Sequence, residues 1–223
     1  AQLRSSRTIR NLRRRGAVSD ANYIFTGARG SGKSYALEAL SMRRSRFVLV
    51  DPTSTVTSMD YTSTDPRQIA AVIRKYPNFR ACLWCAHLSG AQFRDALSPI
   101  AAAAEENRFR WTTVAVDEVG VVAAGRQSLD EVERSARMGR HHKVSWWFSS
   151  QRLTDTSTNL RAQAERIFAF RTASAVDVER VRKEYGKEAA EALSSLEPFH
   201  YLAIDTQTRL WSVRKPIKNP RRS

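Results

Sequence analysis

The chain has 223 residues, with 37 Lys and Arg against 22 Asp and Glu, and a formal net charge of +15. A hydrophobic content of 42% excludes a wholly disordered chain and indicates one globular domain with tails. No apolar run approaches the roughly 20 residues of a spanning helix, and the Arg-rich first fifteen residues lack the apolar core of a secretory signal. We therefore expect neither a transmembrane segment nor a signal peptide.

The excess positive charge is concentrated at the two ends of the chain. Residues 1–15 and 209–223 each hold six basic residues and no acid, and the body between them is nearly balanced. We predict a basic N-terminal arm over 1–16, one globular domain over 17–208 and a basic C-terminal tail over 209–223. Such arms commonly contact nucleic acid or an anionic surface, and the alternative is an extension that only aids solubility.

Short apolar runs typical of buried strands alternate with helical patterns along the body. The strands are predicted over 22–26, 46–51, 80–85, 112–116, 144–149, 166–170 and 200–204. The helices are predicted over 33–43, 67–75, 91–106, 129–138 and 176–193, and the loops over 53–65 and 120–127. This alternation predicts an α/β fold with a mostly parallel central sheet flanked by helices. In the fourth helix, Ser128 to Glu131 reads as a capping box at its start and Gly139 as its end.

A phosphate-binding loop follows the first predicted strand. The eight residues from Gly27 to Ser34 fit the pattern G-x-x-x-x-G-K-[ST], between an apolar strand and an amphipathic helix. Glycines let backbone N–H groups wrap phosphates, and the helix N-terminus adds its positive dipole end. The nucleotide-binding residues are therefore predicted to be Gly27, Ala28, Arg29, Gly30, Ser31, Gly32, Lys33, Ser34 and Tyr35. Lys33 would reach the β- and γ-phosphates, and Ser34 would ligate Mg²⁺.

Two acids, Asp117 and Glu118, end the buried strand predicted over 112–116. Beside a phosphate-binding loop, this pair is what an ATPase needs for its second motif. Asp117 would hold Mg²⁺ through water, and Glu118 would polarise the attacking water. The sequence also contains no N-K-x-D guanine-reading motif, so ATP is favoured over GTP.

The strand over 144–149 leads into Gln151, whose position predicts a side chain beside the phosphate-binding loop. Gln151 could then bridge the γ-phosphate or the attacking water. Upstream, Arg137 and Arg140 are candidates for an arginine that enters a neighbouring subunit's site. Arg137 has a simpler explanation as an i,i+4 ion pair with Glu133, and Arg140 is slightly preferred because it follows the expected helix end.

Two further patterns are interpreted as core packing. Cys82 and Cys85 have metal-ligand spacing, but there is no second cysteine pair and the stretch reads as a buried strand. Trp146 and Trp147 alternate across a strand, so one or both should pack in the core.

Taken together, the motifs resemble the HerA/FtsK group of P-loop ATPases, which are of the RecA-like (ASCE) type. The resemblance covers most of residues 21–205. It rests on the phosphate-binding loop, on Asp51-Pro52, on Asp117-Glu118, and on the Ala-Arg-Met-Gly-Arg run with the Phe-Ser-Ser-Gln-Arg block that ends at Arg152. No proline follows Gln151-Arg152, which is a departure from the group's usual pattern.

This resemblance implies a ring-forming motor that pumps double-stranded DNA with ATP and Mg²⁺. A body limited to the ATPase core is similar to the genome-packaging ATPases of membrane-containing viruses and small phages. It implies a homo-oligomeric ring, a pentamer or a hexamer, in the host cytoplasm or at the virion vertex. A capsid vertex or portal protein would be a partner, and the basic arms could contact a membrane. The alternatives are a morphogenesis or secretion ATPase that moves protein, and a nucleotide-dependent scaffold.

Overall fold

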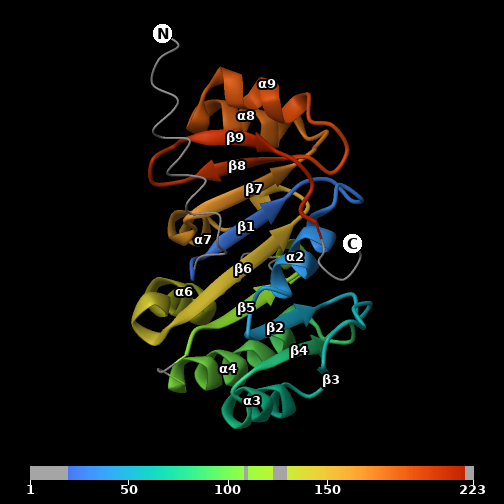
Figure 1. The fold of residues 1–223 in the computed structure, drawn as a ribbon, viewed down its shortest axis with the longest axis vertical. Helices are drawn as coiled ribbons and strands as arrows, with labels where there is room; N and C mark the ends of the chain where they lie inside the picture. Colours follow the sequence, from blue (N-terminus) through green and yellow to red (C-terminus); the bar gives the residue numbers. More distant parts are fainter. Residues whose placement is uncertain (1–19, 108–109, 123–129, 219–223) are drawn as a thin grey trace.

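The computed structural model describes residues 20–107, 110–122 and 130–218. In this part of the chain nine strands form a single sheet in the order β3-β4-β2-β5-β6-β1-β7-β8-β9 (Figure 1). The strands are β1 (Tyr23–Thr26), β2 (Arg46–Asp51), β3 (Tyr61–Ser63), β4 (Phe79–Trp84), β5 (Thr112–Val116), β6 (Val144–Ser150), β7 (Arg166–Phe170), β8 (Tyr201–Asp205) and β9 (Trp211–Arg214). All pairings from β3 to β7 are parallel, and β8 and β9 add an antiparallel edge.

Helices cover both faces of this sheet, as expected when parallel strands are joined by crossovers. They are α2 (Lys33–Ser41), α3 (Pro66–Lys75), α4 (Gly90–Glu106), α5 (Val119–Val122), α6 (Asp130–His142), α7 (Thr158–Gln163), α8 (Ala175–Tyr185) and α9 (Lys187–Ser194), with a 3₁₀ turn over Leu153–Asp155. The α2 helix packs on one face, and α3, α4 and α6 to α9 contribute to the core on the other. The fold class predicted from the sequence is therefore confirmed.

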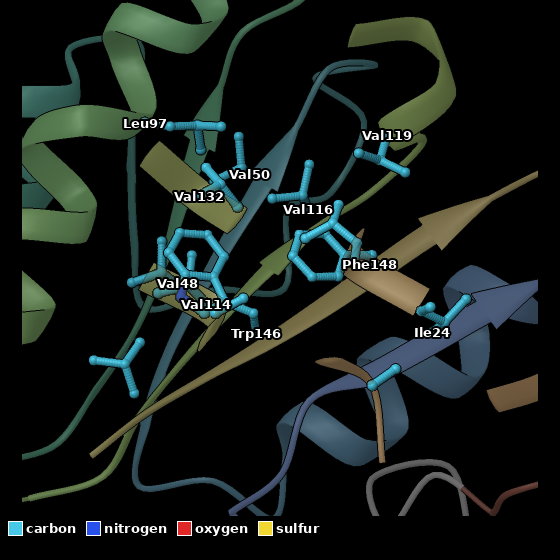
Figure 2. Packing of buried hydrophobic residues seen from close by; sticks show 14 of the residues in the cluster. Ile24, Val48, Val50, Leu97, Val114, Val116, Val119, Val132, Trp146 and Phe148 are labelled. Carbon is cyan, nitrogen blue, oxygen red and sulfur yellow. The ribbon is translucent and has the colours of Figure 1, made fainter. Parts of the chain in front are cut away.

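The period of two along each strand divides the core between the two faces. On one face valines of β2 and β5 meet Trp146 and Phe148, and Leu97 of α4 and Val132 of α6 close over them (Figure 2). On the other face Trp147 packs with Tyr23 and Phe25 of β1 beneath α2. Both tryptophans are fully buried, as the sequence predicts.

Gly139 does not end the fourth predicted helix, because α6 continues to His142. The residue that leaves the helix is Lys143, which has a left-handed φ of 55°. Gly139 instead allows a close approach, since a Cβ there would lie 2.3 Å from the carbonyl oxygen of Val144. The Ser128 cap of this helix lies outside the described residues.

Four other local expectations are corrected. The helix predicted over 176–193 is two helices, because Gly186 at φ 97° separates α8 from α9. The loop over 53–65 contains β3, and the loop over 120–127 overlaps the end of α5. The sheet also continues past residue 208 into β9, so the domain boundary predicted there moves into the segment interpreted as a basic tail. The predicted N-terminal arm lies outside the described residues.

Within the described ranges, no helix combines the length and the apolar character that crossing a membrane requires.

Candidate nucleotide-binding site

The predicted site residues follow three neighbouring strands. The sheet order places β5, β6 and β1 side by side, and their parallel direction brings their carboxyl ends to one edge. The register pairs Thr26 at the end of β1 with Ser150 at the end of β6. The phosphate-binding loop, the acids after β5 and Gln151 after β6 therefore share this edge, as the sequence predicts.

Glycines of the phosphate-binding loop have left-handed backbones for which side chains are unsuited. Gly27 has φ 146°, and a Cβ there would lie 2.8 Å from Cβ of Phe170 and 2.9 Å from its carbonyl oxygen. Gly30 has φ 75°, and the space where its side chain would project is open. The loop is thus packed against β7 on one side and has room for a ligand on the other.

The N-terminus of α2 has donors without side-chain acceptors. Gly32 is its N-cap, in a left-handed conformation, and no side chain caps the helix. The first N–H groups of a helix then need another acceptor, and a phosphate is well suited to them. The side chains of Arg29, Ser34 and Tyr35 are exposed at this loop.

Lys33 is folded back onto the loop that precedes it. The residue is only 4% exposed, and its ammonium group donates to the carbonyl oxygens of Gly27 at 2.7 Å and Ala28 at 3.1 Å. Burial lowers the pKa of the Lys33 amine, and the nearby Glu118 and Asp117 act in the opposite direction. The two carboxylates therefore favour the charged form that a phosphate would need.

Ser34 and Asp117 lie in direct contact, although they are far apart in the sequence. The hydroxyl of Ser34 donates to Oδ2 of Asp117 at 3.2 Å. A hydroxyl and a carboxylate side by side are the oxygen ligands that Mg²⁺ prefers. Among the described residues, the buried hydroxyls of Ser31, Thr26 and Ser149 also have no hydrogen-bond partner around this edge. These donors fit a bound Mg²⁺–nucleotide complex.

Glu118 follows directly, with a left-handed φ of 48°, and the Gln151 side chain is hydrogen-bonded to its carboxylate. Burial raises the pKa of Glu118, Lys33 lowers it, and Asp117 and Asp155 raise it. Asp155 lies in the 3₁₀ turn after β6 and belongs to no sequence motif that predicts its place at this site. A carboxylate with a raised pKa next to an amide donor is suited to hold and orient a water molecule.

The two candidate arginines do not join this group. Arg137 and Arg140 lie on α6 and line a pocket of about 610 Å³ with Asn22, which precedes β1. That pocket is at the amino end of β1, whereas the phosphate-binding loop is at its carboxyl end. Neither arginine therefore lies near the phosphate-binding loop of the same chain.

The surroundings of the two arginines differ. Arg140 donates to Oε1 of Glu165 at 2.6 Å, and Arg137 makes no ion pair within the described part of the chain. The expected pair between Glu133 and Arg137 does not form, because the buried Glu133 carboxylate accepts from Ser157 and Asn159.

Two other signals have structural roles. The Asp51 carboxylate accepts hydrogen bonds from the backbone of Thr53, Thr55 and Val56 and from the Thr53 hydroxyl, so it orders the Ser/Thr-rich loop. Cys82 and Cys85 are buried free thiols in the core, as expected.

Neither a protein-family model nor a curated protein sequence matches this chain. Solved structures do match its fold. The genome-packaging NTPase B204 of Sulfolobus turreted icosahedral virus 2, in complex with ATP-γ-S, superposes with a TM-score of 0.74 at 19% identity, over 90% of this chain and 100% of that one. VirB4 of Thermoanaerobacter pseudethanolicus superposes with a TM-score of 0.70 at 11% identity, over 90% of each chain.

A third similar structure is Thermomonospora curvata EccC (ATPases 2 and 3), in complex with a signal sequence peptide. It matches with a TM-score of 0.59 at 12% identity, over 90% of this chain and 38% of that one. These similarities show that the chain has a P-loop ATPase fold. They also confirm, at the level of the fold, the resemblance that the motifs predicted.

Proposed function

We propose that this protein is an ATPase that drives double-stranded DNA through a homo-oligomeric ring, as a viral genome-packaging motor. The observation that carries the proposal is the convergence of Lys33, Ser34, Asp117, Glu118 and Gln151 at one sheet edge, each next to another member of the group. The fold of B204, a genome-packaging NTPase, supports the same reading.

Each residue of this group has a chemical task in ATP hydrolysis. Ser34 and Asp117 would hold Mg²⁺, which when bound offsets phosphate charge. Lys33 would move its ammonium from the carbonyls of Gly27 and Ala28 to the β- and γ-phosphates. Glu118 would accept a proton from the attacking water, and Gln151 would position that water and respond to loss of the γ-phosphate.

The position of the two arginines supports a ring. Because both lie at the sheet edge opposite the phosphate-binding loop, either could stabilise the transition state only in the site of a neighbouring subunit. Arg137 is the better candidate, since Arg140 is engaged by Glu165 at 2.6 Å. This reverses the slight preference for Arg140, which rested on a helix end at Gly139 that the structure does not have.

DNA is the favoured substrate because of the charge of the chain. A net charge of +15, with six basic residues in each terminal fifteen, suits sequence-independent contacts to phosphates. The second candidate is a protein-moving ATPase. One observation favours it: EccC, which has the same fold, was solved with a signal sequence peptide. On either reading the arms could contact DNA, a capsid vertex or a membrane.

The rate of ATP hydrolysis with and without duplex DNA tests the proposal. The DNA-motor reading predicts stimulation that declines as salt rises, because phosphate contacts release counterions. Hydrolysis that ignores DNA at every salt concentration would favour protein transport. Absence of turnover in the assembled oligomer would contradict both enzyme readings. A nucleotide-dependent scaffold would then be the remaining interpretation.

A further inference from the structure

One aromatic side chain at the nucleotide site has no role in the chemistry described above. Phe199 precedes β8 and is 53% exposed, although most phenylalanines of the fold are buried in the core. Its backbone has a left-handed φ of 64°, which is uncommon for any residue other than glycine, asparagine or aspartate. An exposed apolar ring on a strained backbone adds little to the stability of the fold, which points to a function at the surface that the ring touches.

The ring of Phe199 lies against the phosphate-binding loop. Its Cδ1 atom is 3.1 Å from the point where a Cβ on Gly32 would be, and Cε1 of Phe170 is 3.7 Å from the same point. The glycine at this position therefore makes room for the ring. Topology agrees, because β8 is antiparallel to β7 and begins at the edge where β1 ends, beside α2 (Figure 1).

An aromatic ring in this place is suited to bind a nucleobase. The residue after Gly32 is Lys33, so the exposed ring borders the loop that would hold the phosphates. A nucleotide whose phosphates bind this loop is long enough to place its base at the ring. Flat aromatic faces bind bases by stacking, and every base offers such a face. The strained backbone is then explained, since it presents the ring to the ligand instead of to the core.

We propose that Phe199 is the platform on which the purine base of the bound nucleotide stacks. This inference rests on the proposed function of the same site. Removing one base–aromatic stack weakens binding by roughly 5- to 150-fold, so Phe199→Ala should reduce ATP affinity by about tenfold or more. Inorganic tripolyphosphate has no base, and its affinity should stay within about twofold.

Calorimetric titration of the full-length protein with ATP and with tripolyphosphate separates the possibilities. The proposal expects Phe199→Ala to lose ATP affinity alone, and Phe199→Trp to regain it. Leu210→Ala removes a comparably exposed side chain from the β8–β9 connection and should bind both ligands as the wild type does. The proposal is overturned if Phe199→Ala binds ATP normally, or if it loses ATP and tripolyphosphate equally, because the ring would then only support the loop.

A second variant separates binding from folding. Phe199→Gly also removes the ring but suits the left-handed backbone, so it should melt at a higher temperature than Phe199→Ala while showing the same loss of ATP affinity. If the affinity followed the melting temperature instead, the ring would serve stability and the inference would fail. The ratio of ATP to tripolyphosphate affinity is read without DNA, so it stands or falls separately from DNA translocation.

Discussion

Replacement of Lys33 by methionine should change the free energy of unfolding only slightly and the affinity for ATP strongly. Lys33 is 4% exposed, and its ammonium donates to two carbonyl oxygens at 2.7 and 3.1 Å. Methionine keeps the length of the side chain, removes the charge and leaves both carbonyls without this donor. Two lost hydrogen bonds of about 1 kcal/mol each are opposed by relief of the desolvated charge. We expect the free energy of unfolding to change by less than about 2 kcal/mol.

The effect on nucleotide binding should be much larger. One ammonium facing one phosphate charge at about 4 Å, with an effective dielectric constant of about 20, is worth roughly 4 kcal/mol. Lys33→Met should therefore weaken ATP binding by about a thousandfold, measured by titration calorimetry alongside thermal melts. Lys187, an exposed lysine paired with Glu191, provides the control, because Lys187→Met should bind ATP normally. An ATP affinity of Lys33→Met within threefold of the wild type would refute the role given to this lysine.

Three further outcomes follow from the described contacts. Glu118→Gln should bind ATP with near wild-type affinity and lower the hydrolysis rate by at least about a hundredfold, measured by phosphate release. Arg137→Ala alone should be equally inactive. Mixing Arg137→Ala with Glu118→Gln should restore turnover, because some interfaces of a mixed ring have both groups intact. Arg140→Ala should retain most of the activity. Burial raises the pKa of Cys85 to about 12 and raises that of Cys82, so iodoacetamide at pH 8 should modify both thiols only after unfolding, as read by mass spectrometry.

Each of these expectations has a clear contrary result. Wild-type turnover by Glu118→Gln would remove Glu118 from the chemistry. Failure of the two inactive variants to complement each other, in rings shown to be mixed, would exclude an arginine acting between subunits. Rapid alkylation of the native protein would mean that Cys82 and Cys85 are accessible, against their burial in the structure.

The candidate site at the carboxyl ends of the parallel strands could be predicted because its motifs are local and the sheet topology brings them together. Gly27 to Ser34 specifies a strand, a loop and a helix within one short segment, and a parallel sheet then brings the residues after β5 and β6 to the same edge. The sequence thus predicts Gln151 beside the phosphate-binding loop, whereas its contact with Glu118 is seen only in the structure. The buried strands could be predicted equally well, because a run such as Arg46–Asp51 lacks the alternating polar residues of a half-exposed strand.

The features that the sequence could not predict depend on contacts between distant segments. Gly139 reads as a helix end, but its lack of a side chain serves a close approach to Val144. The strand β9 could not be predicted, because basic residues surround it and a charge pattern alone does not reveal its pairing with β8. Phe199 belongs to no sequence motif. Its proposed role depends on its position beside Gly32, which results from the antiparallel pairing of β8 with β7. Gly186 does carry a local signal, because a glycine inside a helical pattern can mark the end of one helix and the start of another.

Displacement of a third strand from a DNA triplex shows whether ATP hydrolysis moves duplex DNA, as we propose. The full-length protein, assembled with ATP and Mg²⁺ on duplex DNA, should release the third strand at a rate that rises with ATP concentration. Glu118→Gln should release none. Steady ATP hydrolysis by the wild type without any strand release would mean that the protein does not move duplex DNA, and the protein-moving alternative would then be preferred.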